Sequence, residues 1–172
     1  MKTVLLCLAL SVSSFWAFSQ AQNTEELIRK FGKNSLENGA TPYSYCFGVN
    51  PKCHASGCSE VTVKTPKDSD VMVTIKTGDT VVRHAYIRSG NSYTFEMPNG
   101  TYQVFFYYGT GWNPGKVMKS TGECEVKGGF VTDEYFGKDD PQVLDNTILE
   151  YELILQKNGN FSTRPSDAGE AF

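Results

Sequence analysis

The sequence lacks the short motifs that mark the common enzyme classes. It has no G-x-S-x-G nucleophile elbow, no phosphate-binding P-loop, no H-E-x-x-H zinc motif and no dinucleotide fingerprint. Histidine is scarce too, since His54 and His84 are the only two in 172 residues. A Ser-His-Asp triad is recognised by its geometry, so the sequence alone gives no argument for one. These absences leave catalysis without a candidate residue, and we expect no cofactor and no metal.

An excess of positive charge is absent as well. Lys and Arg number 16 against 19 Asp and Glu, which gives a net charge of −3. Because binding to nucleic acid needs a concentrated basic face, we expect no nucleic-acid partner. Long apolar runs are missing beyond the N-terminus, and a membrane-spanning helix needs about 20 apolar residues. We therefore expect no transmembrane segment in the mature chain.

The N-terminus has the order of a secretory signal. Lys2 supplies a positive charge, residues 4–10 form an unbroken apolar run, and Ala17 to Ser19 offers a small-x-small cleavage site. We expect a signal peptide over residues 1–19 and export to the periplasm, the cell surface or the exterior. The mature chain then comprises a short helix with an irregular cysteine-containing segment (20–59), a β-sandwich domain (60–157) and a polar C-terminal tail (158–172).

Cysteine usage fits an exported protein. Of five cysteines, one lies in the expected signal, and the other four are Cys46, Cys53, Cys58 and Cys124. An even number in an oxidising compartment predicts disulfides, and of the three possible connectivities we favour Cys53 with Cys58 and Cys46 with Cys124. The alternative is a zinc site that also uses His54. The spacing matches no common structural zinc module, so we favour the disulfides.

Apolar and polar residues alternate with a period of two over much of the chain after residue 59, which puts successive side chains on opposite faces of a sheet. The expected strands are residues 60–64, 71–76, 81–87, 93–97, 101–108, 124–127, 130–135 and 148–156. Residues 23–32 predict a helix, residues 34–59 an irregular segment, and Asn99-Gly100 a tight hairpin turn. The pattern is typical of a mainly β protein. We predict an antiparallel β-sandwich, with a barrel as the other possibility, and one short helix after the signal.

Two stretches resemble known families. Residues 93–104 resemble a hairpin of transthyretin-like (prealbumin-like) and carboxypeptidase-regulatory-like sandwiches, in which a strand that begins with Thr-Tyr follows the turn. This resemblance implies a fold and nothing more. Residues 71–114 look like a family of small exported bacterial proteins. That resemblance implies export and carries over no activity and no catalytic residue.

The most informative feature for function is aromatic. Residues 101–108 are apolar on both faces, so we expect this strand to be central and covered on each side. It leads into residues 109–116, whose glycines and proline are typical of an exposed loop. An exposed tryptophan there would stack on a sugar ring or clamp a peptide. The candidate ligand-binding residues are Tyr107, Tyr108, Trp112, Asn113 and Lys116.

Other polar residues have simpler interpretations. Trp112 can also fold back and plug one end of the sandwich, which we slightly favour for this ring. His84 lies within an expected strand, where a histidine is more often structural than catalytic. The acidic stretch 133–145 lacks the ordered alternation of a calcium loop and is interpreted as a solvated turn.

These observations favour an exported, non-catalytic binding or interaction module of the cell envelope or exterior, with a glycan or a peptide or protein as ligand. Two alternatives stay open. One is a small secreted hydrolase that acts on envelope or dietary polymers, and the other is a structural accessory subunit. A pocket with two converging carboxylates or a Cys-His pair would favour the hydrolase, and a flat apolar patch without a pocket would favour the subunit.

Overall fold

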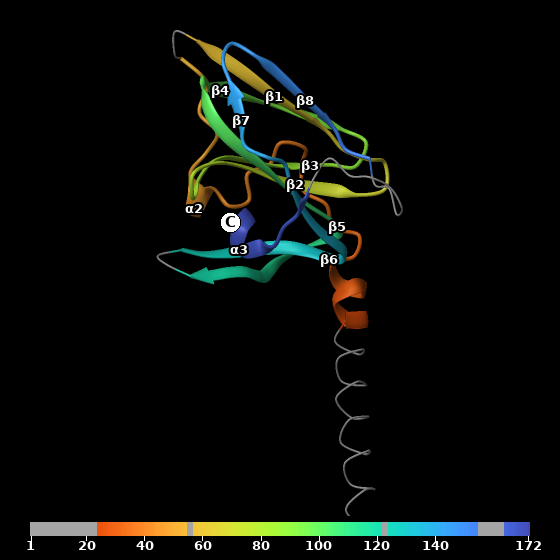
Figure 1. Ribbon diagram of the computed structural model, residues 1–172. Helices are drawn as coiled ribbons and strands as arrows, with labels where there is room; N and C mark the ends of the chain where they lie inside the picture. Colours follow the sequence, from red (N-terminus) through yellow and green to blue (C-terminus); the bar gives the residue numbers. More distant parts are fainter. Residues whose placement is uncertain (1–23, 55–56, 122–123, 155–163) are drawn as a thin grey trace, which may run out of the picture.

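The computed structural model describes residues 24–54, 57–121, 124–154 and 164–172 of the chain (Figure 1). The expected signal peptide and its cleavage site lie outside these residues. The prediction of a mainly β protein is confirmed, since strands dominate and the helices are short. No helix of the described part is long and apolar enough to cross a membrane.

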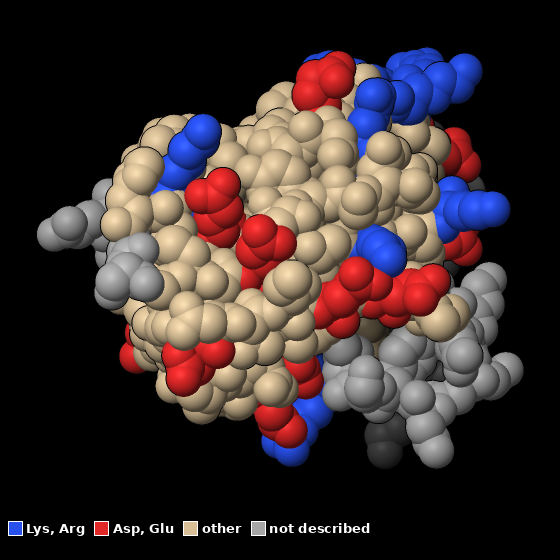
Figure 2. Space-filling model, turned by 90° about the horizontal axis from the view of Figure 1, so that it is seen from above, with Lys and Arg blue, Asp and Glu red and all other residues tan. Residues whose placement is uncertain are grey.

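The first sheet has three strands in the order β4 (Ser92–Pro98), β1 (Cys58–Lys64) and β8 (Ile148–Glu152). β1 runs antiparallel to β4 and parallel to β8, so the sheet is mixed rather than purely antiparallel as predicted. Along β1 exposed and buried residues alternate, as expected for a strand with one dry face. Figure 2 looks down on the end of the molecule that carries this sheet in Figure 1, and acidic and basic side chains both stand there among uncharged ones.

The second sheet has six strands. Its order is β3 (Thr80–Ile87), β2 (Asp70–Thr77), β5 (Gly100–Thr121), β6 (Cys124–Lys138) and β9 (Arg164–Pro165), and β7 (Gln142–Leu144) pairs with the start of β5. Strands β2, β3, β5 and β6 pair as antiparallel neighbours. In Figure 1 the far part of the β5–β6 hairpin curls away from the sandwich and lies below β2 and β3.

Two hydrophobic clusters lie on opposite faces of β2 and β5. Cluster one fills the space between the two sheets and includes Phe95, Phe106 and Tyr108. Cluster two lies on the other face and includes Phe105 and Tyr107. Successive residues of β5 thus enter different clusters, which confirms that this strand is central and covered on both sides. Burying both faces of one strand explains its continuous apolar sequence.

The turn at Asn99 does not form the predicted hairpin. β4 pairs with β1 and β5 pairs with β2, so the turn carries the chain from one sheet to the other. The Asn99 side chain is used in polar contacts instead, because its oxygen accepts from the Ser59 hydroxyl at 2.9 Å and its amide donates to the Asp145 carboxylate at 2.9 Å. The Asn-Gly pair therefore marks a corner of the sandwich here.

Both predicted disulfides are at bonding distance and are confirmed. Cys46 in α2 (Ser44–Phe47) bonds to Cys124 at the start of β6, and Cys53 bonds to Cys58 at the start of β1. The first bond ties the irregular segment that precedes the sandwich to the β5–β6 hairpin. That segment also pairs with the edge of β3, since Ala40 forms an isolated bridge with Tyr86.

The last nine residues of the expected polar C-terminal tail pack against the rest of the protein. Residues 164–172 carry β9 and the helix α3 (Ala168–Ala171), which lies between β2 and β3 and the β5–β6 hairpin (Figure 1). Phe172 is 5% exposed and packs edge-on against Tyr43, with a ring distance of 5.1 Å. One apolar ring therefore anchors the segment in cluster two.

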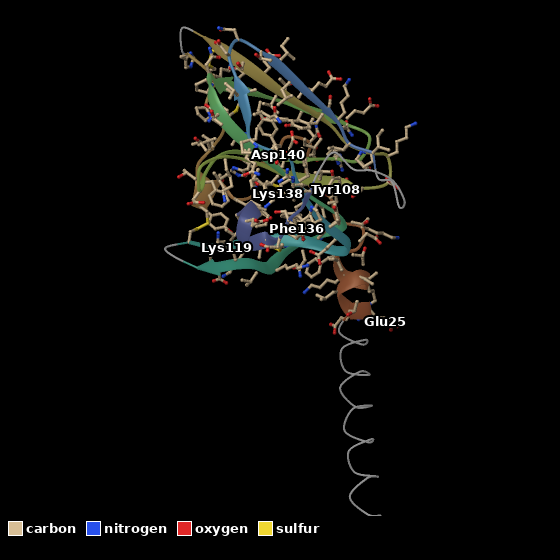
Figure 3. The ribbon with its side chains drawn as sticks, viewed as in Figure 1. Glu25, Tyr108, Lys119, Phe136, Lys138 and Asp140 are labelled. Carbon is tan, nitrogen blue, oxygen red and sulfur yellow. A yellow bond between two sulfur atoms is a disulfide. The ribbon has the colours of Figure 1, made fainter. Side chains whose placement is uncertain are left out.

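Lysine side chains complete the attachment of α3. Lys76 and Lys119 donate to the backbone oxygens of Glu170 and Gly169 at 2.7 and 3.0 Å, and Lys138 pairs with the Glu170 carboxylate at 2.5 Å. Lys119 and Lys138 are labelled in Figure 3. The last carbonyls of a helix have no partner within the helix. Cations at the C-terminal end of a helix also offset its dipole. The composition alone did not reveal these lysine contacts.

Candidate functional site

The candidate site surrounds a point where two distant segments cross. Residues 31–36, named here the crossing segment, run over β5 at Gly111 and Trp112. The backbone N–H of Trp112 donates to the Asn34 carbonyl at 3.0 Å, and the Asn34 amide donates back to the Trp112 carbonyl at 3.2 Å. Gly111 has φ +70°, and a Cβ there would lie 2.6 Å from the Cα of Gly32. Only glycine suits both the positive φ and the lack of space for a Cβ. Its absent side chain lets the two backbones approach each other closely.

Trp112 belongs to the core, and the prediction of an exposed loop over residues 109–116 is wrong. The whole stretch is part of β5, and Trp112 pairs with Phe130 of β6. The Trp112 side chain is only 3% exposed and packs edge-on against Tyr86 and Phe130, with ring distances of 5.3 and 5.4 Å. The register shifts between Tyr108 and Thr110, so the glycines bend the strand without ending its pairing.

Tyr107 and Tyr108 do not lie on one surface. Tyr107 is buried in cluster two, where its hydroxyl hydrogen-bonds to the Glu134 carboxylate and accepts from the backbone N–H of Phe130 at 2.8 Å. Burial and the nearby Glu134 raise the pKa of Tyr107. Tyr108 points into cluster one beside Tyr135, and burial raises its pKa as well. Neither hydroxyl is available as a base.

Asn113 and Lys116 support the bent hairpin. The Asn113 side-chain oxygen accepts from the backbone N–H of Gly115 at 3.0 Å. Lys116 pairs with Glu134 and donates to the backbone oxygen of Phe130 at 2.8 Å. Of the five predicted ligand-binding residues, only Trp112 lines one of the two hollows described below.

An apolar groove opens beside the end of the crossing segment, at Leu36. It has a volume of about 520 Å³, and we name it the aromatic groove. Its lining consists of Leu36, Ala40, Thr41, Pro42, Tyr45, Trp112, Pro114 and Lys127. A rigid apolar wall with few polar groups is the usual composition of a binding pocket.

Tyr45 is the exposed aromatic residue that sequence reasoning missed. The residue is 58% exposed, yet its hydroxyl is fixed because it accepts from the backbone N–H of Lys127 at 2.6 Å and donates to the Glu125 carbonyl at 3.2 Å. The ring is thus held in place before any ligand arrives, which lowers the entropic cost of binding. The only signal in the sequence was the aromatic pair of Tyr43 and Tyr45 beside Pro42.

Among the residues that the structure describes, no group of three or more His, Cys, Asp or Glu side chains converges in a way that could hold a metal ion. The zinc alternative loses its ligands, since all four cysteines are paired. In the acidic stretch, Asp139 accepts from the Tyr151 hydroxyl at 2.7 Å and Asp140 pairs with Arg164 at 3.0 Å. Those carboxylates hold the fold together.

A second hollow, polar in character, is lined by residues 32–35 of the crossing segment and has a volume of about 470 Å³. We name it the polar cleft. Gly32 and Gly111 line it at the crossing, and its charged side chains come from the crossing segment, the β1–β2 connection, the start of β2 and the first residue after β3. The candidate site therefore consists of two neighbouring hollows of different chemistry.

Comparisons of the chain with protein-family models, with curated proteins and with solved structures gave no match. The function must therefore be argued from the geometry of the two hollows.

Proposed function

We propose that this protein is an exported, non-catalytic binding module whose aromatic groove takes an extended, proline-containing peptide segment of a partner protein. The observation that carries the proposal is the Tyr45 ring, which is exposed and yet fixed by its hydroxyl beside a buried tryptophan. Exposed aromatic rings on a rigid base are the usual anchors of recognition surfaces.

The lining favours a peptide over a glycan. Sugar rings present many hydroxyl groups, and each one that is buried needs a hydrogen-bond partner. The aromatic groove offers few, because Leu36, Pro42 and Pro114 make up much of its wall. Its charged residue, Lys127, is already paired with Glu125 at 3.2 Å. Proline-rich segments, in contrast, dock between aromatic rings in an extended conformation that costs little entropy.

Export is supported by the two disulfides together with the expected signal peptide. Disulfides persist in oxidising compartments and are rare in a reducing cytosol. A small hydrolase, the alternative from a different class, gains no comparable support. Cys53 is engaged in a disulfide, so it is not a free nucleophile beside His54.

The experiment measures peptide binding through the fluorescence of Trp112, which is the only tryptophan after residue 19. An array of 12-residue peptides, each with two prolines among apolar residues, is compared with an array in which glycine replaces the prolines. Proline-containing binders found on the array are then titrated in solution. We expect binding to change the Trp112 emission and Tyr45→Ala to weaken it at least about tenfold, as loss of an aromatic anchor does.

Val143→Ala is the matched control, because Val143 is 73% exposed on β7 and outside the aromatic groove. This control should bind like the native protein, and both variants should unfold at nearly the native denaturant concentration. Trp112→Ala is unsuitable here because it would also disturb the core. Equal binding of the two arrays, or unchanged affinity of Tyr45→Ala, would refute the proposal.

A further inference from the structure

The polar cleft has one carboxylate whose role is internal. Asp70, at the start of β2, accepts from the backbone N–H of Ser89 at 2.7 Å and from the Ser35 hydroxyl at 3.0 Å, and it also hydrogen-bonds to the Tyr86 hydroxyl. With three donors around it, this carboxylate is satisfied by the protein. Its contacts fix the crossing segment at Ser35 relative to the loop after β3, so the wall of the cleft is rigid.

The cations of the cleft are not satisfied in the same way. Among the described residues, no carboxylate lies within 4.0 Å of the Lys33 or Lys67 ammonium group. The guanidinium of Arg88 approaches Glu37 only at 4.0 Å, and the Glu37 side chain is 90% exposed. A pair of this kind contributes little. Three positive side chains therefore border the cleft with most of their binding capacity unused.

Arg88 is nevertheless held in place. Its backbone N–H donates to the Asn38 side chain at 3.1 Å, and its Nε donates to the Ser35 hydroxyl at 3.3 Å. Because Nε is engaged, the terminal nitrogens are left to bind another group. A guanidinium binds a carboxylate through two parallel hydrogen bonds, which gives both affinity and orientation.

We propose that the polar cleft is a second binding site and that its ligand is an acidic sugar, the carboxylate of which binds Arg88 between Lys33 and Lys67. The remaining lining suits the sugar hydroxyls. Asp68 lines the cleft, and its carboxylate can accept hydrogen bonds from the hydroxyl groups of a sugar. Asp68 would repel a simple anion and make no favourable contact with it. A hydroxylated anion, in contrast, can bind the cations through its carboxylate and donate to Asp68 through its hydroxyl groups.

This inference goes beyond the proposed function and does not rest on it. The two hollows share no lining residue. Peptide binding and sugar binding can therefore fail separately.

The test is isothermal titration calorimetry of the full mature protein at low salt. The probes are galacturonate and glucuronate as monosaccharides and trisaccharides, the neutral galactose and glucose equivalents, and inorganic sulfate. We expect the acidic sugars to bind and the neutral sugars to bind at least about tenfold more weakly, because they lose one charge-assisted interaction. Sulfate keeps its charge but has no hydroxyl group to donate to Asp68, so we expect it to bind at least about tenfold more weakly as well. If monosaccharides and trisaccharides bind with equal affinity, the ligand is a free acidic sugar. If trisaccharides bind more tightly, the ligand is the end of a sugar chain.

Arg88→Gln should weaken binding of the acidic sugars at least about tenfold, as should the double variant Lys33→Gln and Lys67→Gln. Lys52→Gln, which removes an exposed positive charge outside the cleft lining, should leave the affinity within about twofold. The double variant keeps the test decisive if Arg88→Gln disturbs folding. Sulfate that binds as tightly as galacturonate would overturn the sugar assignment. Equal affinity in the native protein and both cleft variants would overturn the site.

Discussion

His84 makes the stability of this protein sensitive to mild acid. Its side chain is buried in β3 between the rings of Tyr43 and Phe47, at ring distances of 6.0 and 5.8 Å. Nε2 has no hydrogen-bond partner among the described atoms. Burial lowers the pKa of His84 to about 4, and a hydrogen bond to the backbone of Thr41 offsets only part of this effect. The folded protein therefore holds the ring in its neutral form.

The sign of the effect follows from the direction of this pKa change. In the unfolded chain a histidine has its ordinary pKa of about 6.5. Between pH 6.5 and pH 4 the unfolded chain binds a proton that the folded protein does not, so unfolding is favoured as the pH falls. The stabilisation is fully present above pH 6.5. With a pKa of about 4 in the folded protein, its loss reaches about 3 kcal/mol near pH 4.

The perturbation is His84→Asn, because the asparagine amide can still donate to the Thr41 backbone in place of Nδ1. The free energy of unfolding in urea is measured for both proteins at pH 7.5 and pH 4.5. We expect the variant to be less stable at pH 7.5 because it loses packing. We also expect the difference between the proteins to shrink by about 2–3 kcal/mol at pH 4.5. The carboxylates titrate alike in both proteins, so they cancel.

Parallel pH dependence of the two proteins would refute this reasoning. An NMR titration of the His84 ring gives an independent check, since a measured pKa near 6.5 in the folded protein would mean that the ring is solvated.

Two further predictions concern the core and the disulfides. Trp112→Ala should lower the free energy of unfolding by about 3–5 kcal/mol in urea denaturation, as for other large-to-small core changes, and a loss below about 1 kcal/mol would contradict its place in the core. The two disulfides should differ in the same assay. Replacing Cys46 and Cys124, which are 78 residues apart, by alanine should cost about 4 kcal/mol. Replacing Cys53 and Cys58, which are 5 apart, should cost about 2 kcal/mol, and the reverse order would contradict the loop-length argument.

The sequence was sufficient to find strands whose position is set by burial of one or both faces. The alternation around Val61 and Val63 predicted β1, and the apolar run 101–108 predicted the central position of β5. Both patterns are local consequences of burial and need no knowledge of the partner strand. The transthyretin-like topology stays a prediction.

The bend of β5 could not be predicted from local signals. Gly109 and Gly111 are typical of a loop, yet here they allow close contacts along a continuing strand. A Cβ at Gly109 would lie 2.3 Å from the Cβ of Phe130, a residue that follows it by 21 positions. Glycine permits both an exposed loop and a bent, continuing strand, and only the contact with a distant residue decides between the two.

Contacts between residues far apart in the sequence also explain why the predictions at the candidate site were wrong. The exposed aromatic residue was expected at Trp112 and occurs at Tyr45. Tyr45 is fixed by the backbone of Lys127, 82 residues away. The end of the chain follows the same rule, since Lys76 donates to Glu170 across 94 residues. A sequence shows that a ring or a lysine exists, but not which distant backbone atom it meets.

The crossing at Gly111 gives the two hollows a common structural basis. The crossing segment forms one wall of each, through Leu36 for the aromatic groove and through Ser35 for the polar cleft. Its position over β5 depends on the paired hydrogen bonds between Asn34 and Trp112 and on the absence of a side chain at Gly111. The buried tryptophan anchors β5 in cluster two, and its backbone N–H and carbonyl bind Asn34 of the crossing segment. The residue that the sequence suggested as a contact for ligands is thus better understood as the support that keeps both hollows open, while Tyr45 and Arg88 present the groups that a ligand would meet.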